Sequence, residues 1–166
     1  MAIFENEFTW SVSRDAVFKQ CRRKYYYQYY GSWGGWSFDA ENKTRTIYIL
    51  KQLKNRQMWA GTKVHETIEN VLKNIQNGFE IDENEIIEDT IGLMREEFKS
   101  SLAKMYLIKP KTCALFEHEY EVPVSDGEWK KNSEHVIGCL KLFFNSKVYE
   151  DIFQMSPEQW LEVEEF

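Results

Sequence analysis

The chain has 166 residues, of which 43% are hydrophobic, enough to bury one sizeable core, and it is most simply a single domain. No apolar run approaches the roughly 20 residues that cross a bilayer, and the N-terminus lacks the basic region of a signal peptide, so the sequence indicates a cytoplasmic protein without a membrane span. Three scattered cysteines without CxxC spacing do not suggest a disulfide framework; they are Cys21, Cys113 and Cys139.

The net charge of −6 is unevenly distributed along the chain. Residues 1–63 contain 11 Lys/Arg against 5 Asp/Glu, whereas residues 64–166 contain 10 against 22. A basic first third on an acidic remainder indicates a localised surface for a polyanion such as nucleic acid. The alternative is a solvated basic face without a ligand.

A first helix is predicted to begin with Ser13 or Ser11 as its N-cap and to run to Tyr30, where Gly31 stops it. One face of this helix is apolar and consists of Val17, Phe18, Cys21, Tyr25 and Tyr29. The other faces are basic and carry Arg14, Lys19, Arg22, Arg23 and Lys24. An aromatic loop, Trp33–Trp36, follows the helix.

Eight aromatic residues lie between positions 25 and 38, next to four cations within six residues. Cations that reach phosphates, beside rings that stack bases, are what binding to a single strand or a frayed duplex end requires. The candidate nucleic-acid-binding residues are Ser13, Arg14, Arg22, Arg23, Lys24, Tyr26 and Tyr27. The alternative is that the tyrosines are core and the cations are solvated.

A second helix is predicted over Lys43–Arg56. Its inward residues are expected to be Ile47, Leu50 and Leu53, and its outward cations Lys51, Lys54 and Arg56, which continue the basic surface.

The third predicted helix, residues 59–72, carries His65 at the edge of an apolar stripe. Gly61 begins this helix, and Asn77-Gly78 ends it with a left-handed cap. Glu69 lies one turn from His65 on the same side, where it is expected to orient the imidazole or share a divalent ion. The alternative is a packed core histidine.

Two further helices and two extended segments are expected in the remainder. A regular helix covers residues 82–105 and begins with a capping box, and another starts at Ser125 with a second capping box. Alternation over residues 116–122 and again over residues 160–166 indicates short strands. The predicted fold is mainly α: a bundle of about five helices with one or two short strands.

Two motifs resemble the N-terminal half of the RecB-like branch of the PD-(D/E)XK nucleases. The first is Ser-Val-Ser-Arg-x-x-x-Phe-x-x-Cys-x-Arg-Lys-Tyr-Tyr-Tyr, residues 11–27, and the second is Gly-x-x-x-His-x-x-x-Glu, residues 61–69. The match covers about residues 8–72. Arg22 departs from the family pattern, because a proline often follows the cysteine in these enzymes.

The resemblance implies that His65 is a ligand of a catalytic Mg²⁺ or Mn²⁺ and that the basic helix lies near the DNA; Glu69, on the same side of the helix, is the candidate second ligand. It also makes Cys21 equivalent to the first cluster ligand of iron–sulfur members. Cys113 and Cys139 lack the clustered spacing of the other ligands, so an iron–sulfur cluster is not expected.

The leading hypothesis is therefore that residues 1–166 are the helical N-terminal part of an α/β PD-(D/E)XK DNA exonuclease. The family's essential Asp and E-x-K are not found in the expected place, and the chain ends about where the first core strand would begin, so it is expected to be inactive alone. Its expected partners are DNA, the missing C-terminal nuclease core or a helicase. The alternatives are a non-catalytic nucleic-acid-binding module and a protein-interaction scaffold.

Overall fold

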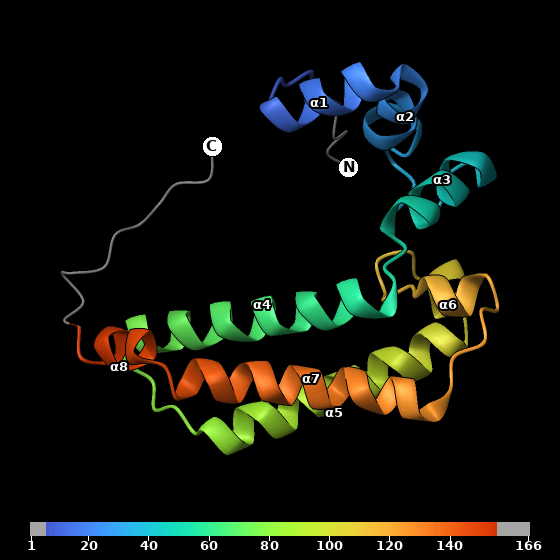
Figure 1. Cartoon of the computed structure of the whole chain (residues 1–166). Helices are drawn as coiled ribbons and strands as arrows, with labels where there is room; N and C mark the ends of the chain where they lie inside the picture. The colour runs from blue at the N-terminus through green and yellow to red at the C-terminus, as the bar shows by residue number, and fades with distance from the viewer. Residues whose placement is uncertain (1–5, 156–166) are drawn as a thin grey trace.

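The computed structural model describes residues 6–155, and this part of the chain is mainly helical, as predicted (Figure 1). The helices are α1 Val12–Gln20, α2 Arg22–Tyr26, the π-helix η1 Tyr27–Gly31, α3 Asn42–Gln52, α4 Arg56–Gln76, α5 Glu83–Leu102, the 3₁₀ helix η2 Met105–Leu107, α6 Phe116–Glu119, α7 Asp126–Phe144 and α8 Lys147–Phe153. Within the described range, every helix is too short or too polar to traverse a lipid bilayer.

Three long helices, α4, α5 and α7, run side by side and enclose the main core (Figure 1). Val71 of α4, Met94 of α5, and Val136 and Leu140 of α7 are all at most 2% exposed. Their helices bury one apolar face each, because hydrophobic residues recur at intervals of three and four. The predicted long helices of this region are thus confirmed, and they form one bundle.

Side-chain caps fix the helix ends as the sequence predicts. The Ser125 hydroxyl accepts a hydrogen bond from the Glu128 N–H, and the Glu128 carboxylate accepts one from the Ser125 N–H, which completes a capping box. Ser11 caps α1, and Asp82 caps α5 by accepting from the Asn84 and Glu85 N–H groups, but the reciprocal Glu85 bond of the predicted capping box is not formed. Gly78 follows α4 with φ +74°, the left-handed conformation expected after a helix.

The start of α4 differs from the prediction of a helix over residues 59–72. The helix begins at Arg56, with Asn55 as its N-cap, and Gly61 lies inside it. A Cβ at Gly61 would have no neighbour within 4 Å among the described residues. Consequently His65 lies in the middle of α4 rather than near its first turn.

Residues 116–122 do not form the predicted strand. Phe116 begins the short helix α6, and the single strand-like pairing within the described range is an isolated parallel bridge between Lys54 and Leu115. In this bridge the Phe116 N–H donates to the Lys54 carbonyl at 2.9 Å. The second predicted strand, residues 160–166, lies outside the described residues.

A buried hydroxyl organises the turn before α6. Ser101 is fully buried, and its Oγ accepts a hydrogen bond from the Leu115 N–H at 2.9 Å and lies 2.9 Å from His118 Nδ1. The His118 ring packs against Phe98 at 4.8 Å. Burial lowers the pKa of His118, which favours the neutral imidazole in this hydrogen bond. His118 therefore links α5 to α6.

Arg56 joins the start of α4 to α6 and α7 instead of extending the basic surface. Its guanidinium donates to the Glu128 carboxylate and to Asn132 Oδ1, both at 2.9 Å. Its backbone N–H donates to the buried Glu117 carboxylate at 2.9 Å. The prediction that Arg56 faces outward was therefore wrong, because the carboxylates that bind it come from residues more than 60 positions away.

Candidate nucleic-acid interface

The basic N-terminal segment forms two short helices instead of the single predicted helix. Helix α1 ends at Gln20, and Cys21 is extended, with φ −164° and ψ 112°. The Cys21 Sγ accepts a hydrogen bond from the Lys24 N–H at 3.5 Å and so caps α2, which continues into η1. The chain therefore changes direction at Cys21, so that α2 packs on α1, and η1 packs on α3 (Figure 1).

Part of the aromatic cluster is structural. Tyr25 is 8% exposed and contacts the rings of Phe18 at 5.3 Å, Tyr29 at 5.0 Å and Tyr30 at 5.8 Å. These rings bury apolar area where three short helices meet, which small helices cannot do alone. The core interpretation holds for Tyr25, whereas Tyr26 is 55% exposed.

The cations of α1 and the start of α2 pack on rings. The Arg14 guanidinium lies 4.4 Å above the Tyr29 ring, and that of Arg22 lies 5.4 Å from the Phe18 ring. Ser13 is exposed, and its hydroxyl lies 2.9 Å from that of Ser11. These contacts orient the side chains on the outside of α1, where they extend the basic surface.

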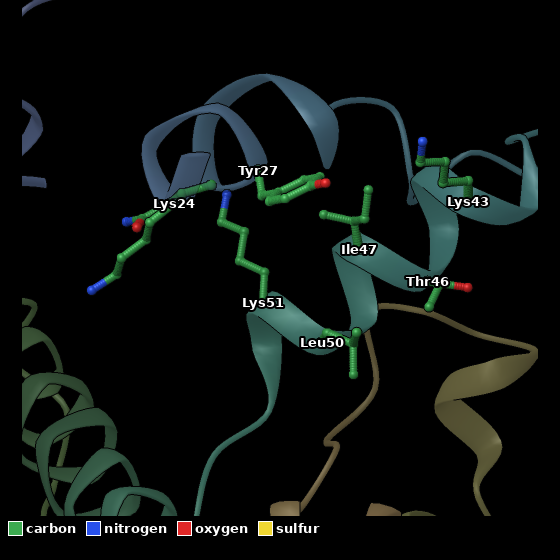
Figure 2. Close-up of a pocket in the computed structure, with 8 residues that line it drawn as sticks. Lys24, Tyr27, Lys43, Thr46, Ile47, Leu50 and Lys51 are labelled. Atoms are coloured by element: carbon green, nitrogen blue, oxygen red, sulfur yellow. The ribbon is translucent and has the colours of Figure 1, made fainter. Parts of the chain in front are cut away.

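An open groove of about 880 Å³ lies between α2–η1 and α3. We call it the α2–α3 groove, and its lining residues are Lys24, Tyr27, Gln28, Lys43, Thr46, Ile47, Leu50 and Lys51. Figure 2 shows Tyr27 projecting from the first wall toward Ile47, with the Lys51 side chain rising beside it from α3. Three lysines thus line the groove together with a ring and an aliphatic floor; the Lys24 side chain points away from Tyr27 in Figure 2, and its ammonium donates to Gln20 Oε1 at 2.9 Å.

Positively charged side chains lie close to the Tyr27 ring and lower the pKa of its phenol. The Arg23 guanidinium lies 5.7 Å from the ring centre. A hydrogen bond from Arg23, its charge and the charge of Lys43 all lower the pKa of the Tyr27 phenol. Partial burial and the nearby Arg14 charge lower the pKa of Lys51. The groove is therefore a region of positive potential, and an anion that enters it is stabilised.

The floor of the groove corrects the predicted orientation of the second helix. Ile49 is the buried residue of α3, at 5% exposure, and it packs with Leu53. Leu50 is 43% exposed, and together with Ile47 it faces the groove. Two aliphatic side chains assigned to the core are therefore available to a ligand.

Of the wall that α3 contributes, the sequence analysis predicted only Lys51, as part of the basic surface. Lys43, Thr46, Ile47, Leu50 and Lys51 line the groove, and their spacing of three or four residues places them on one face of the helix. A helical stripe that has cations at both ends and aliphatic residues between them was the available signal. The predicted residues Lys24 and Tyr27 lie on the opposite wall.

The candidate metal ligands His65 and Glu69 do not lie in a group with further metal-binding side chains among the described residues. His65 is exposed on α4, and Glu69 forms an ion pair with Lys73 of the same helix, which lowers the pKa of Glu69. Within residues 6–155, no group of three or more His, Cys, Asp or Glu side chains could hold a metal ion. Cys21 is an exposed free thiol whose pKa is lowered by hydrogen bonds from the Lys24 and Arg23 N–H groups. The described residues therefore do not by themselves fit a metal or iron–sulfur centre.

Comparisons of the sequence with models of protein families, with curated proteins and with solved structures gave no match. The resemblance of residues 8–72 to RecB-like nucleases stays a prediction. The function of the α2–α3 groove is therefore inferred from its own side chains.

Proposed function

We propose that the chain binds single-stranded nucleic acid, and that the α2–α3 groove is the site. The observation that carries this proposal is the placement of Lys24, Lys43 and Lys51 around Tyr27 in one open groove. Each ammonium group can contact a phosphate, and the tyrosine ring offers a surface on which an unpaired base stacks.

A single strand fits this groove better than a duplex. The bases of a duplex are stacked and paired inside it, so they cannot reach Tyr27 without being unpaired, whereas the bases of a single strand or a frayed end are free to do so. The aliphatic floor of Ile47 and Leu50 adds an apolar contact for the base or sugar. Preference for a single strand is therefore expected, with little preference among sequences.

The stacking role of Tyr27 is tested by a Tyr27→Leu substitution. Leucine keeps an apolar side chain and removes the ring, so the affinity for a fluorescein-labelled oligothymidylate is expected to fall about 5- to 150-fold, because one stacked base contributes about 1–3 kcal/mol. Fluorescence anisotropy at fixed salt measures this change.

Tyr120→Leu is the matched control, because Tyr120 is an exposed tyrosine on the loop after α6 and is 54% exposed. Its substitution should leave the oligonucleotide affinity unchanged. If Tyr27→Leu binds the oligonucleotide as tightly as the unmodified chain does, the groove is not where the base stacks.

We propose further that this strand-binding part serves a RecB-like, Mg²⁺- or Mn²⁺-dependent nuclease, with His65 as one metal ligand. The resemblance of the two motifs supports this role, and the exposure of His65 leaves its imidazole accessible to a ligand. The second candidate is a non-catalytic binding module. The pairing of Glu69 with Lys73 favours it, because that carboxylate already has a cationic partner on its own helix.

Metal linkage distinguishes these two functions. If His65 belongs to a metal site completed by acidic ligands from outside the described residues, Mn²⁺ should change the oligonucleotide affinity of a protein that contains those ligands, and His65→Ala should abolish that change. A non-catalytic module predicts the same affinity with and without Mn²⁺ and a silent His65→Ala substitution. A protein-interaction scaffold, the third alternative, predicts no oligonucleotide binding even at low salt.

A further inference from the structure

A second, smaller cavity lies in the helical bundle, between α5 and α7. Its volume is about 290 Å³, close to the lower end of the size range of small-molecule sites. Its lining residues are Trp59, Met94, Arg95, Phe98, Lys99, Trp129, Lys130 and Ser133. We call it the α5–α7 pocket; it shares no lining residue with the α2–α3 groove.

The inner wall of the α5–α7 pocket is aromatic and held in place. The Trp129 ring lies 5.0 Å from Phe98 and 6.4 Å from Trp59. Trp59 is only 4% exposed, and its indole N–H donates to the Glu97 carboxylate at 2.6 Å. Because these rings are fixed by contacts within the core, they offer a pre-formed apolar surface to a flat ligand.

The outer rim of the pocket is cationic. Arg95 and Lys99 are one turn apart on α5, and Lys130 faces them from α7. All three are exposed, and the described residues that line the pocket include no acidic side chain. The like charges of Arg95 and Lys99, four residues apart, destabilise α5 slightly. This rim is notable because residues 64–166 carry 22 acidic residues against 10 basic ones.

The carboxylates near the α5–α7 pocket either bind residues outside its rim or pair only weakly with a rim cation. The Glu97 carboxylate accepts from Trp59 and pairs with Lys63 at 2.6 Å. Glu134 lies 3.6 Å from the Lys130 ammonium, and both side chains are more than half exposed, so solvent screens this pair. The three rim cations therefore remain available to an anionic ligand.

We propose that the α5–α7 pocket binds one nucleotide unit, with its base against the aromatic wall and its phosphate at the rim of Arg95, Lys99 and Lys130. Charge complementarity selects the anion, the aromatic wall selects a planar apolar body, and the small volume limits the ligand to a single unit. The nucleotide is either a free mononucleotide or one residue of a bound strand. The pocket is argued from its own residues and does not depend on the function of the α2–α3 groove.

The experiment uses the full chain carrying Lys24→Gln, Lys43→Gln and Lys51→Gln, so that the α2–α3 groove contributes little. AMP, adenosine and inorganic phosphate are titrated separately by isothermal calorimetry. AMP is expected to bind at least 10-fold more tightly than either adenosine or phosphate, because only AMP uses both the wall and the rim. Adding Arg95→Gln, Lys99→Gln and Lys130→Gln should weaken AMP binding at least 10-fold.

A charge-matched control replaces Lys73, Lys131 and Lys141 with glutamine in the same background. These lysines are exposed and line neither cavity, and Lys131 is the immediate neighbour of Lys130. The control should bind AMP like its parent. The inference is overturned if the rim substitutions leave AMP affinity unchanged, if the control weakens it equally, or if phosphate binds as tightly as AMP.

A short oligothymidylate then distinguishes the two sources of the nucleotide. If the rim substitutions also weaken oligonucleotide binding, the pocket takes one residue of a strand. If they weaken AMP binding alone, it takes a free mononucleotide. Either result supports a nucleotide site between α5 and α7.

Discussion

Glutamine in place of Lys24, Lys43 and Lys51 is expected to lower the affinity for a single-stranded oligonucleotide on the order of 100-fold at 0.1 M salt. Each lysine that neutralises a phosphate releases about 0.7 of a counterion from a single strand, so three contacts account for a salt exponent of about 2. Anisotropy titrations over a range of salt concentrations measure the slope of log affinity against log salt concentration. In the triple variant this slope should be shallower by about 2.

The triple substitution of Lys73, Lys131 and Lys141 is the control for this experiment as well, because it removes the same total charge from exposed positions outside the α2–α3 groove. It should keep the salt exponent and most of the affinity. Equal losses in the two triple variants would mean that net charge, and not the groove, determines binding. Circular dichroism should show that both variants are folded, since all six side chains are exposed.

Ser101→Ala is expected to lower the free energy of unfolding by about 1–3 kcal/mol. The substitution leaves the buried Leu115 N–H without its acceptor and removes the partner of His118 Nδ1, and an unsatisfied buried polar group costs about this much. Urea unfolding followed by circular dichroism measures the effect. Alanine is the better helix former, so a loss of stability cannot come from helix propensity.

Ser100→Ala provides the matched comparison one residue earlier on α5. Ser100 is only half-buried, so the alanine variant should unfold within about 0.5 kcal/mol of the unmodified chain or be slightly more stable. If the two variants have the same urea midpoint, the hydrogen bonds of Ser101 do not contribute to the stability of the turn before α6.

The bundle was predictable because its signals are local. The apolar spacing of α5 and α7 and the capping box of Ser125 with Glu128 lie within single helices, so periodicity and cap chemistry identify them. Residues 116–122 were not predictable in this way. Their alternation is that of a strand, but Ser101 and Lys54 bind the backbone before and at the start of α6, and these partners are distant in sequence.

The candidate interface was predictable on one wall and not on the other. Arg23, Lys24 and Tyr27 lie within five residues of one another, so the local composition alone indicates a site that binds phosphates and bases. Lys43 and Lys51 become part of the same site only because the chain turns in the loop after η1, where Trp36 packs on Tyr48 at 5.7 Å, and returns along α3. Sequence periodicity places these lysines on a helix face but does not say what that face meets.

The pairing of Lys54 with the segment before α6 lies between α3 and the bundle, so it would carry tension from a strand bound at the proposed α2–α3 site. Tension on α3 would pass to the three-residue link before α4, where the Lys54 N–H donates to the Ala114 carbonyl at 3.1 Å and the Lys54 carbonyl accepts from the Phe116 N–H at 2.9 Å. Two backbone hydrogen bonds at Lys54 thus connect this link to the segment before α6. Together with the packing of Ile49 on Tyr106 and Ala114, these bonds hold α3 to the segment before α6, so both contacts would resist a force applied through the proposed site.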